Sequence, residues 1–193
     1  MEKKLIFVAA PPACGKTYVS ELVAREAQPM VYLDKDDLCH LLRAAFAVAG
    51  EGVNMDGNFY LENLRPAEYS TILQIGFSAL RYADRVLINA PFGAEVRDPG
   101  FMKAMKQKAN ACGAQLVLIW VMATPELCYR RMKERNSDRD TRKLADWDRY
   151  VKTLNFAPPS DLETQCAVDR LIVFDTKDDL TVRSSLEETL RWL

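Results

Sequence analysis

Five short, continuous apolar segments constrain the fold of this chain more than any other feature of its sequence. They are rich in valine, isoleucine and leucine, and they cover residues 5–9, 31–33, 86–88, 116–122 and 171–174. Segments with helical character separate or follow them, at residues 15–26, 38–48, 66–81, 99–112, 124–134 and 179–193. Continuous apolar strands, rather than alternating ones, are typical of a parallel sheet whose two faces are both covered. The sequence therefore predicts a three-layer α/β fold with a doubly wound, parallel five-stranded sheet.

The composition excludes several classes of protein. The 193 residues include 26 basic and 27 acidic ones, and a net charge of −1 gives no general reason to bind nucleic acid or a membrane. A single histidine, His40, rules out a histidine-rich metal centre, and five cysteines without a C-x-x-C pair argue against a disulfide framework. The first apolar segment is too short for a signal peptide, and no segment approaches the ~20 apolar residues of a membrane span. We expect one cytoplasmic domain over residues 1–193, as a monomer or homodimer without a membrane partner.

The first apolar segment is followed by APPACGKT, residues 10–17, which matches G-x-x-x-x-G-K-[ST] except that alanine replaces the first glycine. In such a loop the backbone N–H groups bind phosphate, the lysine reaches the β- and γ-phosphates, and the hydroxyl binds Mg²⁺. We therefore expect nucleotide contacts from Pro12, Ala13, Cys14, Gly15, Lys16, Thr17 and Tyr18. Two alternatives stay open: an ordinary turn that contains Gly-Lys-Thr, and a redox role for Cys14, since a helix N-terminus lowers a thiol pKa.

Three separated segments, residues 4–20, 32–38 and 134–141, are similar to P-loop kinases of the AAA-type group that includes zeta toxins and phage-type polynucleotide kinases. The resemblance implies a P-loop NTPase fold with a helical lid, ATP and Mg²⁺ as cofactors, and transfer of the γ-phosphoryl group to a hydroxyl acceptor. The polynucleotide kinases usually carry an arginine shortly after the second strand, where this chain has Cys39 and His40. That difference favours a small-molecule acceptor. A polynucleotide 5′-hydroxyl, a nucleotide-sugar and a non-catalytic ATP-binding regulatory module remain as alternatives.

Further candidates follow the second and third predicted strands. In the resembling kinases an aspartate after the second strand orients the acceptor hydroxyl, and by motif position this residue is Asp36. Its neighbour Asp34 is a candidate substrate contact. Asn89 stands where many P-loop proteins hold Mg²⁺ through water, so it joins Thr17 as a candidate metal residue. The alternatives are a helix N-cap for Asp36 or Asp37 and a simple turn residue for Asn89.

A basic segment at about residues 130–145 is the predicted lid. Residues 130–143 hold seven basic and three acidic side chains, which gives a net charge of +4. Arginines on a mobile segment suit the stabilisation of a triphosphate, and we expect Arg135 and Arg139 to act on phosphate as catalytic residues. The general arrangement of P-loop kinases implies that Arg131 and Thr176 flank the adenine. A solvated helix face is the alternative interpretation for the charged residues.

The least regular part of the chain lies within the predicted acceptor-binding insertion, at about residues 43–82. Its glycine and asparagine content favours a mobile loop between the second and third strands. We expect Arg65 and Arg97 to bind an anionic acceptor and Phe92 to face the same cavity. Structural ion pairs are the open alternative for the two arginines.

Overall fold

A five-stranded parallel sheet forms the centre of the computed structural model, which describes residues 2–193 except for the side chains of residues 138 and 139. The strands are β1 (Lys3–Ala9), β2 (Val31–Asp34), β3 (Arg85–Asn89), β4 (Ala114–Met122) and β5 (Arg170–Asp175). They lie in the order β2-β3-β1-β4-β5, and every neighbouring pair is parallel. The prediction of a parallel five-stranded sheet is confirmed, with each strand one or two residues longer than its apolar segment.

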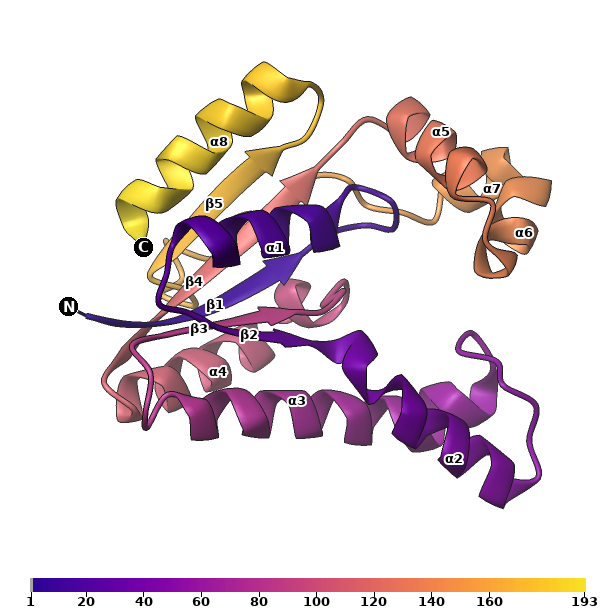
Figure 1. Ribbon diagram of the computed structural model, residues 1–193, viewed down its shortest axis with the longest axis horizontal. Coiled ribbons are helices and arrows are strands. Elements are labelled where there is room, and N and C mark those ends of the chain that lie inside the picture. The colour runs from indigo at the N-terminus through magenta and orange to yellow at the C-terminus, as the bar shows by residue number, and fades with distance from the viewer. Residues whose placement is uncertain (1) are drawn as a thin grey trace.

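Helices cover both faces of this sheet (Figure 1). The helices α1 (Lys16–Glu26) and α8 (Asp179–Trp192) cover one face, and α3 (Arg65–Ala79) and α4 (Pro99–Ala111) cover the other. Alternate residues of β1 accordingly enter two separate apolar clusters. Leu5 and Phe7 pack with residues of α3 and α4, while Ile6 and Val8 pack with residues of α1. Burial on both faces explains why the strands read as continuous apolar segments.

Further helices lie near the carboxyl ends of the strands. Between β2 and α3 are η1 (Lys35–Leu38), α2 (Cys39–Ala49) and η2 (Tyr60–Leu64), and η3 (Glu95–Arg97) precedes α4. After β4 come α5 (Pro125–Arg135), α6 (Asp138–Ala145) and α7 (Trp147–Val151). The six predicted helices are confirmed to within two residues, and α6 lies within the helical lid expected at about residues 130–145, whereas α7 and the three η segments were not predicted. Within residues 2–193, no helix has the length and apolar character needed to span a bilayer.

The carboxyl ends of the strands meet at one edge of the sheet because all the strands are parallel. β1 is central and leads into residues 10–15 and then α1. Asp34, the last residue of β2, is the register partner of Asn89, the last residue of β3. Asn89 is in turn the partner of Val8 in β1. The predicted phosphate loop and the predicted acidic residues therefore lie at the same edge, where ligands bind in doubly wound sheets.

Candidate active site

The loop between β1 and α1 has the backbone conformation of a phosphate-binding loop. Ala13 and Gly15 adopt left-handed conformations, with φ of 65° and 91°. Ala10 does not have a positive φ, so alanine in place of the first glycine costs nothing in backbone strain. The left-handed conformation costs an L-residue such as Ala13 roughly 1–2 kcal/mol. The loop ends at the N-terminus of α1, where free N–H groups and the helix dipole favour an anion.

Arg131 and Thr176 form hydrogen bonds to the backbone of this loop. The Thr176 hydroxyl donates to the Cys14 carbonyl oxygen at 2.9 Å. The Arg131 guanidinium donates to the Ala13 carbonyl oxygen at 3.4 Å and to the hydroxyl and carbonyl oxygens of Thr176, both at 3.0 Å. Both residues therefore shape the loop backbone directly. Their predicted contact with adenine stays a prediction.

Cys14 lies against a second cysteine. Its Sγ is 3.5 Å from the Sγ of Cys128 in α5, and both side chains are fully buried. The hydrogen bond to Cys128 and the burial together raise the pKa of the Cys14 thiol far above its usual range. A protonated, buried thiol is unreactive, so the geometry favours the interpretation of Cys14 as a small residue whose backbone N–H matters.

Thiol labelling tests this interpretation. We expect iodoacetamide to modify the exposed Cys166 and the half-buried Cys39 and Cys112 in the native protein. Cys14 and Cys128 should react at least about a hundredfold more slowly, because they become accessible only after local opening of the structure. Mass spectrometry of labelled peptides, with and without denaturant, measures these rates. Native labelling of Cys14 as fast as that of Cys166 would restore a redox role.

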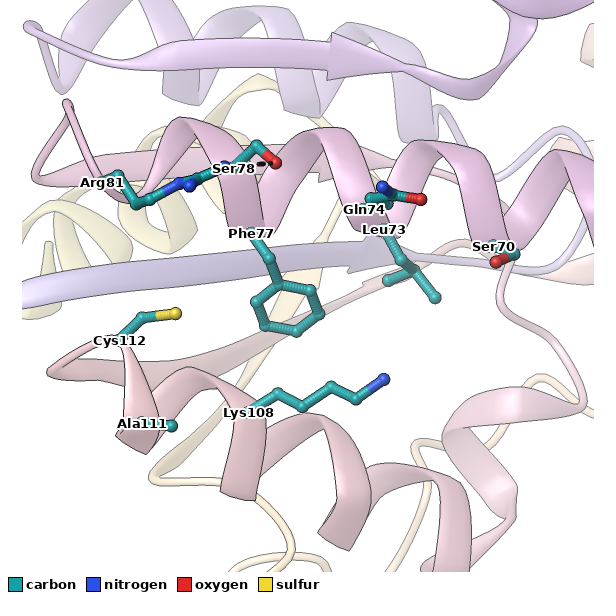
Figure 2. Close-up of a pocket in the computed structure, with 9 residues that line it drawn as sticks. All are labelled: Ser70, Leu73, Gln74, Phe77, Ser78, Arg81, Lys108, Ala111 and Cys112. Atoms are coloured by element: carbon teal, nitrogen blue, oxygen red, sulfur yellow. Dashed lines mark hydrogen bonds between the residues drawn. The ribbon is translucent and has the colours of Figure 1, made fainter.

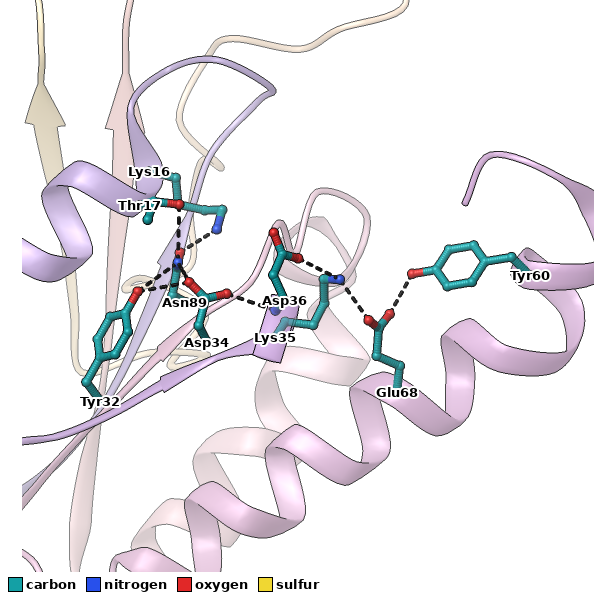
Figure 3. A network of polar contacts seen from close by, with 9 residues as sticks. All are labelled: Lys16, Thr17, Tyr32, Asp34, Lys35, Asp36, Tyr60, Glu68 and Asn89. Carbon is teal, nitrogen blue, oxygen red and sulfur yellow. Dashed lines mark hydrogen bonds and ion pairs between the residues drawn. The ribbon is translucent and has the colours of Figure 1, made fainter. Parts of the chain in front are cut away.

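A compact polar cluster joins the phosphate loop to the second and third strands (Figure 3). The Lys16 ammonium donates to Oδ1 of Asn89. The Asn89 amide nitrogen donates to Oδ2 of Asp34 at 2.5 Å and to the Tyr32 hydroxyl at 3.1 Å, and it lies 3.5 Å from Thr17 Oγ1. The Tyr32 hydroxyl donates to the same Asp34 oxygen at 2.9 Å. Burial, with this hydrogen bond and the Asp34 charge, raises the pKa of Tyr32 well above its usual range.

The orientation of Asn89 bears on its predicted role at the metal. Its oxygen is occupied by Lys16, and its N–H groups face Asp34 and Thr17. An amide nitrogen does not bind a cation, whereas the hard carboxylate and hydroxyl oxygens beside it fit Mg²⁺. The amide thus holds Lys16 and Asp34 in place, and an aspartate at position 89 would set two carboxylates against each other. The side chains that fit magnesium are Thr17 and Asp34.

The 3₁₀ helix η1 presents the candidate acceptor-orienting residue, Asp36. Oδ1 of Asp34 accepts the Asp36 backbone N–H at 2.9 Å and thereby caps η1. Asp34 therefore fills the capping role that the sequence offered to Asp36 or Asp37, because η1 intervenes before α2 and shifts the helix start. The Asp36 side chain is 69% exposed and pairs with the Lys35 ammonium at 3.1 Å.

Of the two lid arginines expected to act on phosphate, Arg135 and Arg139, the structure describes the side chain of Arg135. Arg135, near the end of α5, forms two hydrogen bonds to Oδ2 of the buried Asp140 in α6. That ion pair fixes the α5–α6 corner in this conformation, so Arg135 reaches phosphate only if the pair opens. The side chain of Arg139 lies outside the described part of the structure. Their predicted action on phosphate stays a prediction.

Three of the four predicted substrate residues make contacts within the protein, and the substrate contact of the fourth, Asp34, stays a prediction. Arg65 pairs with Glu95 at 2.5 Å and lies over the Tyr69 ring, which is the ion-pair alternative. Arg97 donates to two backbone carbonyl oxygens, those of residues 155 and 157, and lies over the Trp120 ring. Phe92 is fully buried and stacks on Phe7 of β1, so its ring belongs to the core instead of facing a cavity.

Two hollows lie outside this cluster. A groove of about 540 Å³ between α3 and α4 is lined by residues that include Phe77, Arg81 and Lys108 (Figure 2). The carbonyl of Leu80, next to Arg81, accepts from Lys3 at the start of β1, so this end of the groove lies opposite the phosphate-loop edge. No predicted site residue lines this groove.

The second hollow, of about 400 Å³, lies where the predicted insertion and the predicted lid meet. Asp56 of the insertion lines it together with Arg142 of α6 and with Arg149 and Tyr150 of α7. Burial, together with the charges of Asp56 and Asp140, raises the pKa of Tyr150 to about 12. The two segments that the sequence assigned to acceptor and nucleotide thus share a surface.

Four residues at or beside the polar cluster were not predicted as site residues from the sequence. Tyr32 contacts Asp34 as described, and Lys35, Glu68 and Tyr60 form a buried polar chain beside Asp36. The position of Lys35 between two aspartates was the one available signal. Glu68 lies 33 residues further along the chain, and a contact at that separation leaves no local pattern in the sequence.

The parallel sheet and the loop between β1 and α1 together define a P-loop NTPase fold with a phosphate-binding loop. The chain belongs to the AAA domain family, whose model matches residues 5–157. That match includes the phosphate loop, the carboxyl ends of β2 and β3, and the predicted lid. A search of curated protein sequences finds no match to this chain.

Solved structures are similar to this chain over nearly its whole length. A proposed kinase from Chloroflexus aurantiacus is 17% identical, with a TM-score of 0.68, over 100% of this chain and 94% of the other. A gluconokinase from Sinorhizobium meliloti is 16% identical, with a TM-score of 0.55, over 98% and 93%. Chaetomium thermophilum Kti12, in complex with ADP-AlF₃, is 15% identical, with a TM-score of 0.60, over 97% of each chain. At these identities the likeness shows the fold.

Proposed function

We propose that this chain is an ATP- and Mg²⁺-dependent phosphotransferase that transfers the γ-phosphoryl group to a hydroxyl of a small molecule. One observation carries the proposal. The lysine of the phosphate loop is joined through Asn89 to Asp34, the last residue of β2, and Asp34 in turn accepts the backbone N–H of Asp36. Phosphoryl transfer needs positive charge beside the phosphates and a carboxylate beside the acceptor hydroxyl, and the cluster has both.

Each residue of this cluster has a distinct task in the proposed reaction. The N–H groups of the loop and the Lys16 ammonium bind the β- and γ-phosphates, and Lys16 neutralises charge as it develops. The exposed Asp36 carboxylate orients the acceptor hydroxyl and accepts its proton. The acceptor oxygen then bonds to the γ-phosphorus, the bond from that phosphorus to the β–γ bridging oxygen breaks, and ADP leaves. Because positioning dominates this chemistry, the hydrogen bonds among the residues matter as much as their charges.

Magnesium would be held by the Thr17 hydroxyl and, through water, by Asp34. The ion supplies neutralisation of phosphate charge and alignment of the β- and γ-phosphates. Asp34 provides the negative charge that Asn89 lacks at the end of β3. Asn89 and Tyr32 hold the Asp34 carboxylate in place by donating to one of its oxygens.

Removal of the Thr17 hydroxyl tests the magnesium assignment. Thr17→Ala is expected to raise the Mg²⁺ concentration needed for half-maximal ATP turnover by about tenfold or more, since a metal contact is lost. Thr17→Ser keeps the hydroxyl and should remain close to wild type. Titration of turnover with Mg²⁺ at fixed ATP measures the effect. Equal Mg²⁺ requirements in Thr17→Ala and wild type would remove Thr17 from the site.

We propose a small acceptor bound between the predicted insertion, at about residues 43–82, and the lid, at about residues 130–145. The hollow lined by Asp56, Arg142 and Tyr150 supports this proposal, as does the structural similarity to a gluconokinase. The whole chain then acts as one kinase domain.

A polynucleotide acceptor is the second candidate, favoured by the basic lid. It would give a steep loss of affinity with rising salt, because phosphate contacts release counterions, whereas a small acceptor would not. Acceptor KM measured across a salt series separates the two.

A further inference from the structure

A buried chain of three polar side chains lies behind Asp36 and leads into the predicted insertion (Figure 3). The Lys35 ammonium lies 2.9 Å from Oε1 of Glu68 and 3.1 Å from Oδ1 of Asp36. The Tyr60 hydroxyl donates to the other Glu68 oxygen, Oε2, at 2.5 Å. The Glu68 side chain is fully buried and that of Lys35 is 11% exposed. Both Glu68 oxygens are thus occupied, one by Lys35 and one by Tyr60.

Lys35, Glu68 and Asp36 together carry one positive and two negative charges. One ammonium lies between two carboxylates, one of them buried and the other largely exposed. Burial alone would lower the pKa of Lys35, but the hydrogen bond to Glu68 and the charges of Asp36 and Glu68 outweigh it and raise the pKa. A buried ion pair is weak evidence for stability, because apolar side chains of similar volume often do as well. Stability alone therefore does not account for the Lys35–Glu68 pair, and its contact with Asp36 suggests that it positions that carboxylate.

Lys35 acts on the Asp36 side chain, whereas Asp34 acts on its backbone. Asp34 accepts the Asp36 N–H, and Lys35 binds one oxygen of the Asp36 carboxylate. The other oxygen has no hydrogen-bond partner among the described side chains, and the carboxylate is 69% exposed, so this oxygen is available to an acceptor hydroxyl. A carboxylate held at one oxygen has fewer conformations to lose when it binds a hydroxyl.

Glu68 and Tyr60 connect this arrangement to the insertion. Tyr60 belongs to η2 and packs with Leu42 and Phe46 of α2 in a small apolar cluster, separate from the two clusters at the sheet. Glu68 lies in the first turn of α3. A shift of η2 relative to α3 therefore changes the partners of Glu68 and, through Lys35, the position of the Asp36 carboxylate.

We propose that Lys35 is a positioning residue for Asp36, and that Glu68 and Tyr60 make this positioning depend on the conformation of the insertion. The inference rests on the proposed function, since it assumes that Asp36 faces the acceptor. It adds a coupling: an acceptor that orders the insertion also fixes the carboxylate that receives its hydroxyl.

Turnover kinetics test the coupling. Lys35→Met is expected to lower kcat by between about tenfold and about a hundredfold while the KM for ATP stays unchanged, because a misplaced group slows the transfer step. Tyr60→Phe removes one hydroxyl and should lower kcat roughly threefold. Lys106→Met is the matched control, because Lys106 also forms a partly buried ion pair, with Asp169 at 3.0 Å, away from the cluster. It should leave kcat unchanged.

A double-mutant cycle distinguishes positioning from general destabilisation. In an Asp36→Asn background, Lys35→Met should produce no further loss of kcat, because the carboxylate it positions is gone. The same fold-loss in both backgrounds, or an unchanged kcat in Lys35→Met, would overturn the proposal.

A spectroscopic arm is independent of turnover and separates failure of this inference from failure of the proposed function. With ¹³C-labelled aspartate, the side-chain carboxyl signal of Asp36 should shift in both Lys35→Met and Tyr60→Phe, and the signal of Asp37 should not. Lys106→Met should move neither signal. An Asp36 signal that is the same in Lys35→Met as in wild type would overturn the inference even if the enzyme is active. If the signal shifts in the variants but the wild-type protein transfers no phosphate, the positioning of Asp36 is upheld and the proposed kinase function is rejected.

Discussion

Replacement of Lys16 by alanine is expected to lower the rate of phosphoryl transfer by about 10²–10³-fold, the usual effect of removing one preorganised donor from a developing charge. The ammonium lies at the N-terminus of α1 and is held by Asn89, so no other side chain of the cluster replaces it. Because Lys16 binds ground-state phosphate as well, the KM for ATP should rise too. Initial rates of ADP formation over an ATP series give both constants.

Lys108→Ala is the control for Lys16→Ala, since Lys108 is an exposed cation on α4 in the groove away from the phosphate loop. It should retain wild-type rates. Turnover in Lys16→Ala equal to that of wild type would show that the measured ATP consumption does not arise at this loop. The phosphotransferase assignment would then fail.

Replacement of Asp36 by asparagine is expected to lower kcat by about 10²–10⁴-fold, the usual contribution of a positioned general base. The amide still orients a hydroxyl but no longer accepts its proton. ATP affinity should change by less than about twofold, because the Asp36 carboxylate pairs with Lys35 and is proposed to face the acceptor, so its removal leaves ground-state binding of ATP intact. Isothermal titration with a non-hydrolysable ATP analogue measures binding, and product formation measures kcat.

Asp37→Asn is the matched control for Asp36→Asn. Asp37 has the same charge, the same helix η1 and a similar exposure, but it lies one residue further along. We expect it to retain kcat to within a few-fold. Equal losses in the two variants would assign the effect to the local charge of η1, and a greater loss in Asp37→Asn would move the acceptor-orienting role to that residue.

The sheet was predictable because a strand that is buried on both faces of the sheet consists of consecutive apolar residues. All five segments became strands, and the conformations of residues 10–15 agree with the phosphate-loop pattern. Residues 138–151 are mostly polar and show no apolar helical pattern, so α7 was missed and α6 was expected only as part of the helical lid that the resemblance implied. The helix η1 was missed because a single turn of 3₁₀ helix has no periodicity to detect.

The candidate site was predictable in part for the same reason. Asp34 and Asp36 lie one and three residues after an apolar segment, and Lys16 and Thr17 follow another after a loop of six residues, so the fold brings all four to one edge of the sheet. Arg65 and Arg97 carry the right charge, but their partners are a glutamate 30 residues away and backbone carbonyls about 60 residues away. Charge alone in a sequence does not distinguish an ion pair within the protein from an acceptor contact.

The most direct test of the account is the detection of a phosphorylated acceptor. The protein is incubated with Mg²⁺-ATP and a panel of polyols, sugar acids, nucleosides and 5′-hydroxyl oligonucleotides, and the products are analysed by mass spectrometry. We expect a phosphomonoester of a small acceptor, formed with one ADP for each product and absent in Lys16→Ala. ATP that is bound but never transferred to any acceptor, or a product confined to the oligonucleotides, would contradict this account.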